Sequence, residues 1–213
     1  MTDNSTLGYF VTGTDTNVGK TVLSALLVAA LEAAYWKPVQ TGTNEGADRE
    51  SVCRWTEASE DRLPLERYRF NQPVSPHLAS RQEGVHISLE QLALPDVPAG
   101  RKLIVEGAGG VMVPLNDRDL MRDLMRQIGF PAIVASRTSL GTINHTLLTL
   151  AALREASVAI CGVALIGDED VENRRAIEHY GKVRVIGRIP ILDVINRVTL
   201  LGAYEKHFDH GVF

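Results

Sequence analysis

The sequence predicts an α/β fold in which a parallel β-sheet is flanked by helices. Short apolar runs rich in β-branched and aromatic residues alternate with longer segments whose apolar residues recur at helical spacing. The first run is followed by a loop rich in Gly and Thr and then by a segment dense in Leu and Ala. A later run ends in a glutamate followed by glycines. Because strands alternate with helical segments, the strands are expected to be parallel.

Composition limits the kinds of protein that this chain can be. Its 213 residues, 45% of them hydrophobic, are enough to bury a large core as a single domain over residues 1–213. The net charge of -4 disfavours non-specific binding to nucleic acid or anionic membranes, both of which need a dense Lys/Arg surface. The first six residues lack the basic and apolar regions of a signal peptide, and no apolar run reaches the ~18 residues of a membrane span. We therefore expect a cytoplasmic protein with no nucleic-acid or membrane partner.

The loop at residues 13–21 has the character of a phosphate-binding loop. Its N–H groups and the positive end of the next helix converge on one anion, which places Lys20 for the β- and γ-phosphates and Thr21 for Mg²⁺. The usual motif has its first glycine where Thr14 stands, whereas here the glycine lies one residue earlier. The order of strand, loop and helix still favours nucleotide binding over an ordinary turn. The expected nucleotide contacts in the loop are Gly13, Asp15, Thr16, Asn17, Val18, Gly19, Lys20 and Thr21.

Lys37 is the informative residue of the next segment. Residues 22–34 contain no Gly or Pro and predict a helix, and residues 35–42 predict a second strand. The connection between them is short, so either the helix ends early or the strand is short. A lysine inside a buried parallel strand is costly unless it faces an anion. Lys37 therefore either lies beside bound phosphates or extends to solvent from an edge strand.

Between residues 43 and 95 the main candidate site residue is Asp48. It lies where a polar loop gives way to a predicted helix at residues 49–59. Taken alone, Asp48 is best explained as an N-cap, with metal ligation as the alternative. Residues 73–77 contain two prolines and predict an extended or turning segment, in which His77 is more simply structural than catalytic. Residues 87–94 predict a short amphipathic helix.

The second strong signal is the apolar strand at residues 102–106, which ends in Glu106 and precedes a predicted glycine-rich turn at residues 107–110. It resembles a Walker B arrangement with Glu in place of the more familiar Asp. Mg²⁺ takes oxygen ligands and must be held against the phosphates, so a carboxylate at a strand end suits this role. Glycines allow close backbone approach. We expect this segment to contact nucleotide through Glu106, Gly107, Gly109 and Gly110.

The second half of the chain predicts the remaining elements. Strands are expected at residues 131–136, 158–166 and 183–190, and helices at 119–127, 146–156, 171–180 and 193–208. Gly141 and Thr142 precede one of these helices and form a second potential anion site. Thr142 alone is equally explained as a helix cap.

Five motifs follow one another in the sequence: Val11-Thr12 with the loop at residues 13–21, Lys37-Pro38-Val39-Gln40-Thr41-Gly42, Ser75-Pro76-His77, Glu106-Gly107-Ala108-Gly109-Gly110 and Gly141-Thr142-Ile143-Asn144-His145. Together and in this order they resemble the dethiobiotin synthetase family, whose loop has the same longer glycine spacing. The resemblance spans almost the whole chain and implies a P-loop NTPase-like fold. It also implies an ATP-dependent cyclo-ligase that forms dethiobiotin, ADP and phosphate from 7,8-diaminononanoate and CO₂ or bicarbonate, through a carbamate and a carbamic-phosphoric anhydride, in biotin biosynthesis.

The resemblance also implies roles for individual residues in a homodimer with active sites at the subunit interface. By this resemblance, catalysis would be carried by Lys20, Lys37 and Thr16, Mg²⁺ would be held by Thr21, Asp48 and Glu106, and ATP would be the co-substrate. Substrate would be bound by Thr16, Lys37, Thr41, Ser75 and Pro76, and across the subunit boundary by Gly141, Thr142, Ile143 and Asn144.

One departure from the family concerns the nucleotide base. Many members carry an Asn at the end of the strand matched by residues 162–167, where its amide pairs with adenine. Ile166 and Gly167 stand there in this chain and cannot make that pair. We hypothesise that base selectivity is weak and is supplied by backbone contacts near Gly167 and from Pro190 to Leu192.

Two other classes share parts of this pattern. A noncatalytic dimeric ATPase switch of the partitioning type has a similar sheet, but its loop has an early lysine that Gly13-Thr14-Asp15 lacks. An amidotransferase-linked synthetase of cobalamin-type pathways needs a glutaminase domain, for which 213 residues leave no room.

Overall fold

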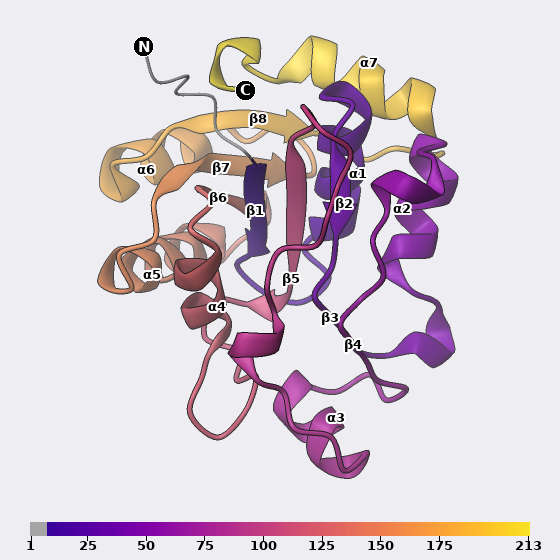
Figure 1. Cartoon of the computed structure of the whole chain (residues 1–213). Coiled ribbons are helices and arrows are strands. Elements are labelled where there is room, and N and C mark those ends of the chain that lie inside the picture. The colour runs from indigo at the N-terminus through magenta and orange to yellow at the C-terminus, as the bar shows by residue number, and fades with distance from the viewer. Residues whose placement is uncertain (1–7) are drawn as a thin grey trace, which may run out of the picture.

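A six-stranded parallel sheet in the order β2-β5-β1-β6-β7-β8 forms the centre of the protein (Figure 1). The structure is a computed structural model that describes residues 8–213, so the predicted absence of a leader at the N-terminus lies outside the described residues. The parallel sheet with flanking helices confirms the predicted fold class. Its strands are β1 (Gly8–Gly13), β2 (Ala34–Trp36), β5 (Leu103–Gly110), β6 (Ala132–Arg137), β7 (Ile160–Ile166) and β8 (Val185–Ile189).

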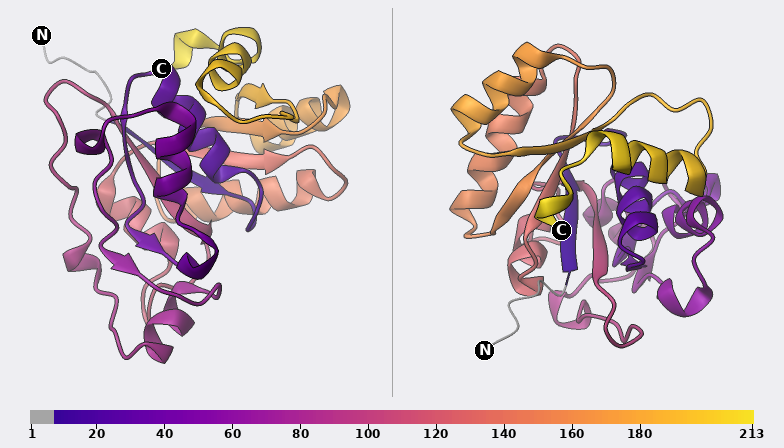
Figure 2. Two further views of the ribbon diagram at one scale, coloured as in Figure 1. Left: turned by 90° about the vertical axis from the view of Figure 1, so that its right-hand side faces the viewer. Right: turned by 90° about the horizontal axis from the view of Figure 1, so that it is seen from above.

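Helices cover both faces of this sheet (Figure 2). Successive strand residues point to opposite faces, so Tyr9 and Val11 enter the core beneath α1 and α7, whereas Phe10 enters the core beneath α4 and α5. Apolar side chains on both faces explain why the strands are nearly continuous hydrophobic runs. The helices are α1 (Lys20–Ala30), α2 (Asp48–Thr56), α4 (Met121–Ile128), α5 (Thr142–Glu155), α6 (Val171–Gly181) and α7 (Arg197–His207).

The short connection after α1 contains both an early helix end and a short strand. The helix ends at Ala30 rather than at residue 34, and Glu32 has a φ of 50° in the turn that follows. Strand β2 has only three residues. The prediction of one strand over residues 35–42 is wrong, because Pro38 has no N–H and separates β2 from β3 (Val39–Gln40). Strand β3 pairs instead with β4 (Tyr68–Arg69) in a separate two-stranded sheet.

Proline also changes the structure predicted for residues 73–77. Pro76 begins helix α3 (Pro76–Gln82), and the residue before it, Ser75, is extended. The first position of a helix suits proline because its missing N–H would have no intrahelical acceptor. The predicted extended segment is therefore correct up to Ser75 and wrong beyond it.

The predicted helix at residues 87–94 does not form, and only a 3₁₀ turn at Leu89–Gln91 is present. Side chains from elsewhere satisfy the main chain of this segment. Asn116 Nδ2 donates to the carbonyl of Ile87 at 2.9 Å, and Gln127 Nε2 donates to that of Leu89 at 2.8 Å. These tertiary contacts replace the hydrogen bonds of a helix.

The second half of the chain follows the prediction closely, and the largest shifts, of four residues, are at three boundaries. Strand β5 continues through the predicted turn to Gly110, helix α5 begins four residues earlier than expected, at Thr142, and α7 begins at Arg197 rather than at residue 193. Asn196 caps α7 by accepting from the N–H of Thr199 at 3.0 Å. Among residues 8–213, no helix is long and apolar enough to cross a bilayer.

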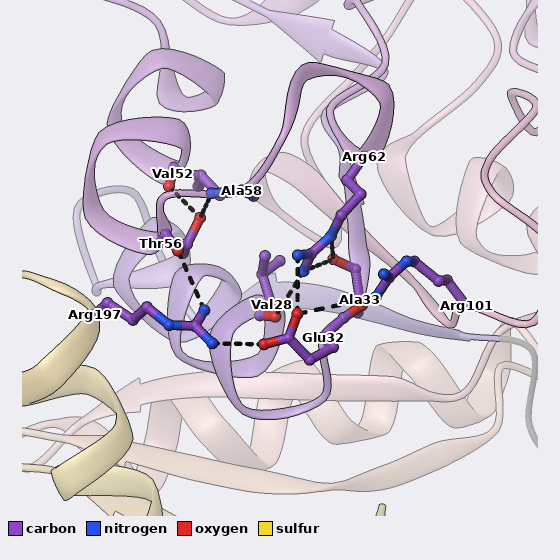
Figure 3. A network of polar contacts seen from close by, with 9 residues as sticks. All are labelled: Val28, Glu32, Ala33, Val52, Thr56, Ala58, Arg62, Arg101 and Arg197. Atoms are coloured by element: carbon purple, nitrogen blue, oxygen red, sulfur yellow. Dashed lines mark hydrogen bonds and ion pairs between the residues drawn. The ribbon is translucent and has the colours of Figure 1, made fainter.

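The two ends of α1 carry different polar groups. At the carboxyl edge of the sheet, its N-terminus follows the loop after β1. At the other end, Glu32 pairs with Arg62, Arg101 and Arg197, which come from three separate segments (Figure 3). Ligands of open α/β sheets bind outside the carboxyl ends of the strands, so the loop end of α1 is where a site is expected.

Candidate active site

The loop between β1 and α1 is shaped to hold an anion. A side chain at Gly13 would place its Cβ 2.6 Å from Val18 Cγ2, so glycine permits the tight curl of the loop. Gly19 is the N-cap of α1 with a φ of 93°, and no side chain caps the helix. The N–H groups of the first helical turn therefore remain available to a bound anion.

Lys20 crosses this loop from the first turn of α1. Its ammonium donates to the main-chain oxygen of Asp15 at 2.9 Å, and its side chain is almost fully buried. Burial lowers the pKa of Lys20, and the attraction of Glu106 offsets this effect only in part. An approaching phosphate would favour the charged form of the lysine.

Arg137 supports the loop from a neighbouring strand and was missed by the sequence analysis. It stands at the end of β6, and its guanidinium donates to the carbonyls of Thr16 at 3.1 Å and Asn17 at 3.3 Å. The sequence held no signal for this contact, which joins residues about 120 positions apart. Arg137 thus holds the segment that contains the predicted catalytic residue Thr16.

Glu106 lies at the centre of the polar groups beneath the loop. It is 0% exposed and accepts hydrogen bonds from Thr21 Oγ1 at 3.0 Å, Lys37 Nζ at 3.1 Å and the Tyr35 hydroxyl at 3.0 Å. Lys37 also forms an ion pair with Asp48. The structure therefore joins Thr21, Lys37, Asp48 and Glu106, which were predicted as site residues from separate parts of the sequence.

Burial and charge act in opposite directions on Lys37. Burial alone would lower its pKa, but the carboxylates of Glu106 and Asp48 together outweigh that effect, so the pKa is raised and the ammonium stays charged. The side chain is 6% exposed, so the interpretation in which Lys37 extends to solvent from an edge strand is wrong. A position beside bound phosphates stays a prediction. Burial also raises the pKa of Tyr35 well above its usual range, and the charge of Glu106 raises it further.

Asp48 is the first residue of α2 and not its N-cap, which is Ala47. Its N–H donates to Gln40 Oε1 at 3.2 Å, while its carboxylate turns toward Lys37. The N-cap interpretation is therefore wrong. Gln40 belongs to the same motif as Lys37, and the sequence analysis assigned it no role; its hydrogen bond connects the start of this helix to that motif.

A cleft of about 710 Å³ opens over these groups. The P-loop, the segment after β2, the start of α2, the segment before α3 and the end of β5 all contribute to its walls. Ser75, which lines the cleft, shares a 3.0 Å hydrogen bond with His77 Nδ1, and this contact gives His77 a structural role. The predicted site residues that line the cleft are Thr16, Asn17, Gly19, Lys20, Thr21, Lys37, Thr41, Asp48, Ser75, Pro76, Glu106 and Gly109.

A second cavity of about 400 Å³ lies on the other side of the loop. Asp15, Thr16 and Gly110 line it together with His145 and Leu148 of α5. Thr16 thus borders both cavities. The predicted substrate residues Gly141, Thr142, Ile143 and Asn144 line neither of the two cavities.

Thr142 neither caps α5 nor exposes its hydroxyl. The N-cap is Gly141, with a φ of 95°, and Thr142 is 5% exposed. Its hydroxyl donates to the carbonyl of Arg137 and shares a 2.8 Å hydrogen bond with Ser136. The cap interpretation is wrong, and the first-turn N–H groups of Ile143 and Asn144 are the donors that point out of this helix end.

The residues expected near the base also line neither cavity, namely Gly167, Pro190 and Leu192. Gly167 already donates its N–H to Ile189 O and accepts from Arg188 Nη1, both at 2.9 Å. Its neighbour Ile166 lies against the P-loop, where its Cγ2 would be 2.9 Å from a Cβ at Gly19. An apolar side chain therefore stands where the family's amide was expected.

The donor set of the cleft fits a hard cation. Among residues 8–213 there is no group of three or more His, Cys, Asp or Glu side chains arranged for a metal. Asp48, Glu106 and Thr21 instead offer two carboxylates and a hydroxyl, which are oxygen ligands of the kind that Mg²⁺ prefers. Mg²⁺ usually completes its shell with water and substrate phosphates, so three protein ligands are sufficient.

Comparison with known sequences identifies close relatives. The AAA_26 family model, described as an AAA domain, matches residues 7–199. An ATP-dependent dethiobiotin synthetase BioD of Agrobacterium fabrum is 48% identical over 207 residues, covering 97% of each chain. The protein of the same name from Brucella ovis is 46% identical and covers 93% of this chain and 92% of its own. The protein of the same name from Rhodopseudomonas palustris is 45% identical and covers 95% of this chain and 96% of its own.

Solved structures with the same fold are much more distant in sequence. A ParA family ATPase from Chlorobium tepidum superimposes with a TM-score of 0.54 at 12% identity, covering 92% of this chain and 90% of the other. The signal recognition particle receptor FtsY from Elizabethkingia anophelis, solved in complex with GDP, superimposes with a TM-score of 0.51 at 10% identity. The match covers 97% of this chain and 66% of the other. At such identities the likeness shows the fold alone, so it gives no support to the partitioning-switch alternative.

Proposed function

The chain belongs to the dethiobiotin synthetase family, and we propose that it uses ATP to form dethiobiotin from 7,8-diaminononanoate and CO₂ in biotin biosynthesis. This makes it a ligase that forms C–N bonds. The observation that carries the proposal is the cleft in which Lys20, Lys37 and Glu106, from three separate motifs, come together with Asp48. One domain over residues 1–213 and a cytoplasmic location stay predictions.

The chemistry requires positioning and charge neutralisation more than a protein nucleophile. One amine of the diamine attacks CO₂ and loses a proton, which gives a carbamate. A carbamate oxygen then attacks the γ-phosphorus of ATP and expels ADP, which gives a carbamic-phosphoric anhydride. The second amine attacks the carbonyl carbon, loses a proton and expels phosphate, which closes the ring. Holding these groups in line is the main task of the protein.

The residues of the cleft suit these steps. Lys20 and Lys37 would neutralise the charge of the transferred phosphoryl group, and the loop N–H groups would hold the triphosphate. Thr16 borders both cavities, so it would lie between the nucleotide and the diamine, and Thr41, Ser75 and Pro76 also line the cleft. Thr21, Asp48 and Glu106 would hold Mg²⁺, which would neutralise the negative charge of the phosphates when bound.

Substrate omission tests this proposal directly. ADP release is measured with diaminononanoate, bicarbonate, ATP and Mg²⁺, and again with each left out, while the product is identified by mass. We expect ADP and a ureido product only in the complete mixture. Turnover that is independent of the diamine, or a product without the added carbonyl, would contradict the function.

The homodimer is also part of the proposal. Three large apolar side chains near the N-terminal half of α5 are exposed, namely Met112 at 52%, Leu140 at 103% and Leu148 at 62%. Met112 and Leu148 line the second cavity. A second copy that covers this surface would bring its own residues 141–144 to the cavity, where the N–H groups of Ile143 and Asn144 suit a substrate carboxylate.

A charge placed on this surface tests the dimer. Leu148→Glu should give a monomer in light scattering and lose dethiobiotin formation, whereas ATP binding persists. Val198→Glu is the matched control, since Val198 is 78% exposed on α7 on the other face of the sheet. A wild-type enzyme that is monomeric at working concentration with full activity would refute the shared site.

Weak base selectivity is the last part of the proposal. Ile166 offers no hydrogen bond to a base, and both main-chain groups of Gly167 already have partners. Contacts from the segment between Pro190 and Leu192 would then discriminate little. A nucleotide panel checks this, and a preference for ATP over CTP and GTP of more than about a hundredfold would rule it out.

A further inference from the structure

Tyr35 is a buried phenol to which the proposed chemistry assigns no role. Its side chain is 0% exposed, and its hydroxyl donates to Glu106 Oε2 at 3.0 Å. We propose that Tyr35 is a positioning residue that occupies Oε2 of Glu106, so that Oε1 alone serves the phosphate and metal side of the cleft. The inference rests on the proposed function, in which Glu106 is a ligand of Mg²⁺.

Strand register places the phenol in reach of this carboxylate. β2 is parallel to β5 with Tyr35 opposite Ile104, and Tyr35 and Ile104 belong to the same core on one face of the sheet. Glu106 is two residues beyond Ile104 and therefore points to that face as well. Two strand residues rise about 6.6 Å, a distance that a tyrosine side chain lying along the sheet can span. A shorter side chain at position 35 would leave Oε2 without this donor.

The three donors divide the two carboxylate oxygens of Glu106 unequally. Oε1 accepts from Thr21 at 3.0 Å and from Lys37 at 3.1 Å, and both of these residues line the cleft. Oε2 accepts from Tyr35, which does not line it. A carboxylate of 0% exposure needs its donors from the protein, because a buried charge without them is costly.

Loss of the phenolic hydroxyl would disturb the other oxygen. With no donor on Oε2, the carboxylate gains by turning that atom toward Thr21 or Lys37, which moves Oε1 away from the cleft. Partners that orient a ligand in this way commonly change metal affinity by about 10- to 100-fold when they are removed. Tyr35 would thus act on the metal only through Glu106.

The test compares two buried aromatic residues of the same strand. Tyr35→Phe removes only the hydroxyl. Trp36→Phe is the matched control, because Trp36 is also buried and its Nε1 donates to the carbonyl of Leu65 at 3.1 Å, away from the cleft. Mn²⁺ binding to each variant with a non-hydrolysable ATP analogue is measured by electron paramagnetic resonance. We expect Mn²⁺ affinity to fall about tenfold in Tyr35→Phe and to stay unchanged in Trp36→Phe.

A double-mutant cycle with Glu106→Gln separates positioning from general stability. If Tyr35 acts through Glu106, then Tyr35→Phe has no further effect on Mn²⁺ affinity in the Glu106→Gln background. This arm holds even if Tyr35→Phe alone folds poorly, since the double variant has no buried carboxylate to leave unpaired. Unchanged Mn²⁺ affinity in Tyr35→Phe, an equal loss in Trp36→Phe, or a persistent loss in the double variant would each overturn the proposal. A wild-type enzyme that binds Mn²⁺ but forms no dethiobiotin would refute the function instead.

Discussion

The two ends of helix α1 each hold buried charges, but the groups that satisfy those charges differ. At the far end, Arg62 is 7% exposed and donates to the carbonyls of Ala33 at 2.7 Å and Val28 at 3.3 Å, as well as to Glu32 (Figure 3). At the loop end, Glu106 is 0% and Lys37 is 6% exposed, so these charges are also buried. Their partners are side chains, and all of these except Tyr35 line a cleft.

This difference separates a structural cluster from a functional one. The far-end cluster consists of Glu32, Arg62, Arg101 and Arg197, and the loop-end cluster consists of Lys20, Thr21, Lys37, Asp48 and Glu106. Main-chain carbonyls are fixed by the backbone, so their hydrogen bonds to the guanidinium of Arg62 hold the end of α1 in place. A cation at this end also complements the negative end of the helix dipole. Side chains of Thr21, Lys37 and Asp48 can exchange one partner for another when a ligand enters. Burial and charge alone would have marked both clusters as candidate sites, whereas the cavity and the kind of partner mark only one.

The largest effect is expected at Lys37, the cation of the loop-end cluster. Lys37→Ala removes a charge that would stabilise the transferred phosphoryl group, so turnover per folded molecule should fall at least ~10²-fold. Steady-state ADP release measures this. Lys206→Ala, an exposed lysine on α7, is the control and should keep wild-type turnover. Wild-type turnover in Lys37→Ala would return this lysine to a structural role and remove the contrast between the clusters.

Arg62 should show the opposite behaviour. Arg62→Met removes the side-chain donor of the buried carbonyl of Ala33, one of the two donors to the carbonyl of Val28 and one of the three arginine partners of Glu32. The free energy of unfolding should therefore fall by about 2 kcal/mol, while turnover per folded molecule stays unchanged. Urea unfolding and kinetics on the same preparation measure both quantities. Arg126→Met is the control, because Arg126 is 60% exposed and its pair with Asp123 is expected to be worth less than about 1 kcal/mol. Lost turnover at full stability would instead place Arg62 in the active site.

The sequence was sufficient to predict those residues of the loop-end cluster that belong to a short continuous motif. Lys20, Thr21 and Glu106 stand in motifs whose residue spacing itself encodes the phosphate site, so their positions could be predicted before any contact was known. Tyr35 could have been found, because residues two apart in a strand share a face and Lys37 was already suspected. Arg137 could not, because its contact with the loop depends on the order of strands in the sheet.

The errors of prediction also arise from contacts between residues that are far apart in the sequence. Apolar residues at helical spacing predicted a helix at residues 87–94, but hydrogen bonds from Asn116 and Gln127 hold that segment in another conformation. The far-end cluster was not predicted at all, since Glu32, Arg62, Arg101 and Arg197 are scattered over the chain. Local sequence patterns could not predict these long-range side-chain contacts, whereas they did predict the order of strands and helices.

The smallest effect is expected at Glu32 and depends on pH. The hydrogen bond from Arg197 and the charges of Arg197, Arg62 and Arg101 hold the pKa of Glu32 below its usual range. A lowered pKa in the folded state means that the carboxylate adds stability above pH about 4.5 and loses it as the pH falls through the lower folded pKa. Glu32 is 49% exposed, so Glu32→Gln should cost less than about 1 kcal/mol at pH 7.

Urea unfolding of wild type and Glu32→Gln at pH 7 and again below pH 4 checks this sign. The difference in unfolding free energy should shrink toward zero at the lower pH, and turnover at pH 7 should not change. Glu57→Gln is the matched control, since Glu57 also ends a helix with a positive φ, of 57°, but forms no ion pair within residues 8–213. A difference that persists at low pH would mean that Glu32 acts through its backbone turn, and the far-end cluster would then owe its stability to main-chain geometry rather than to charge.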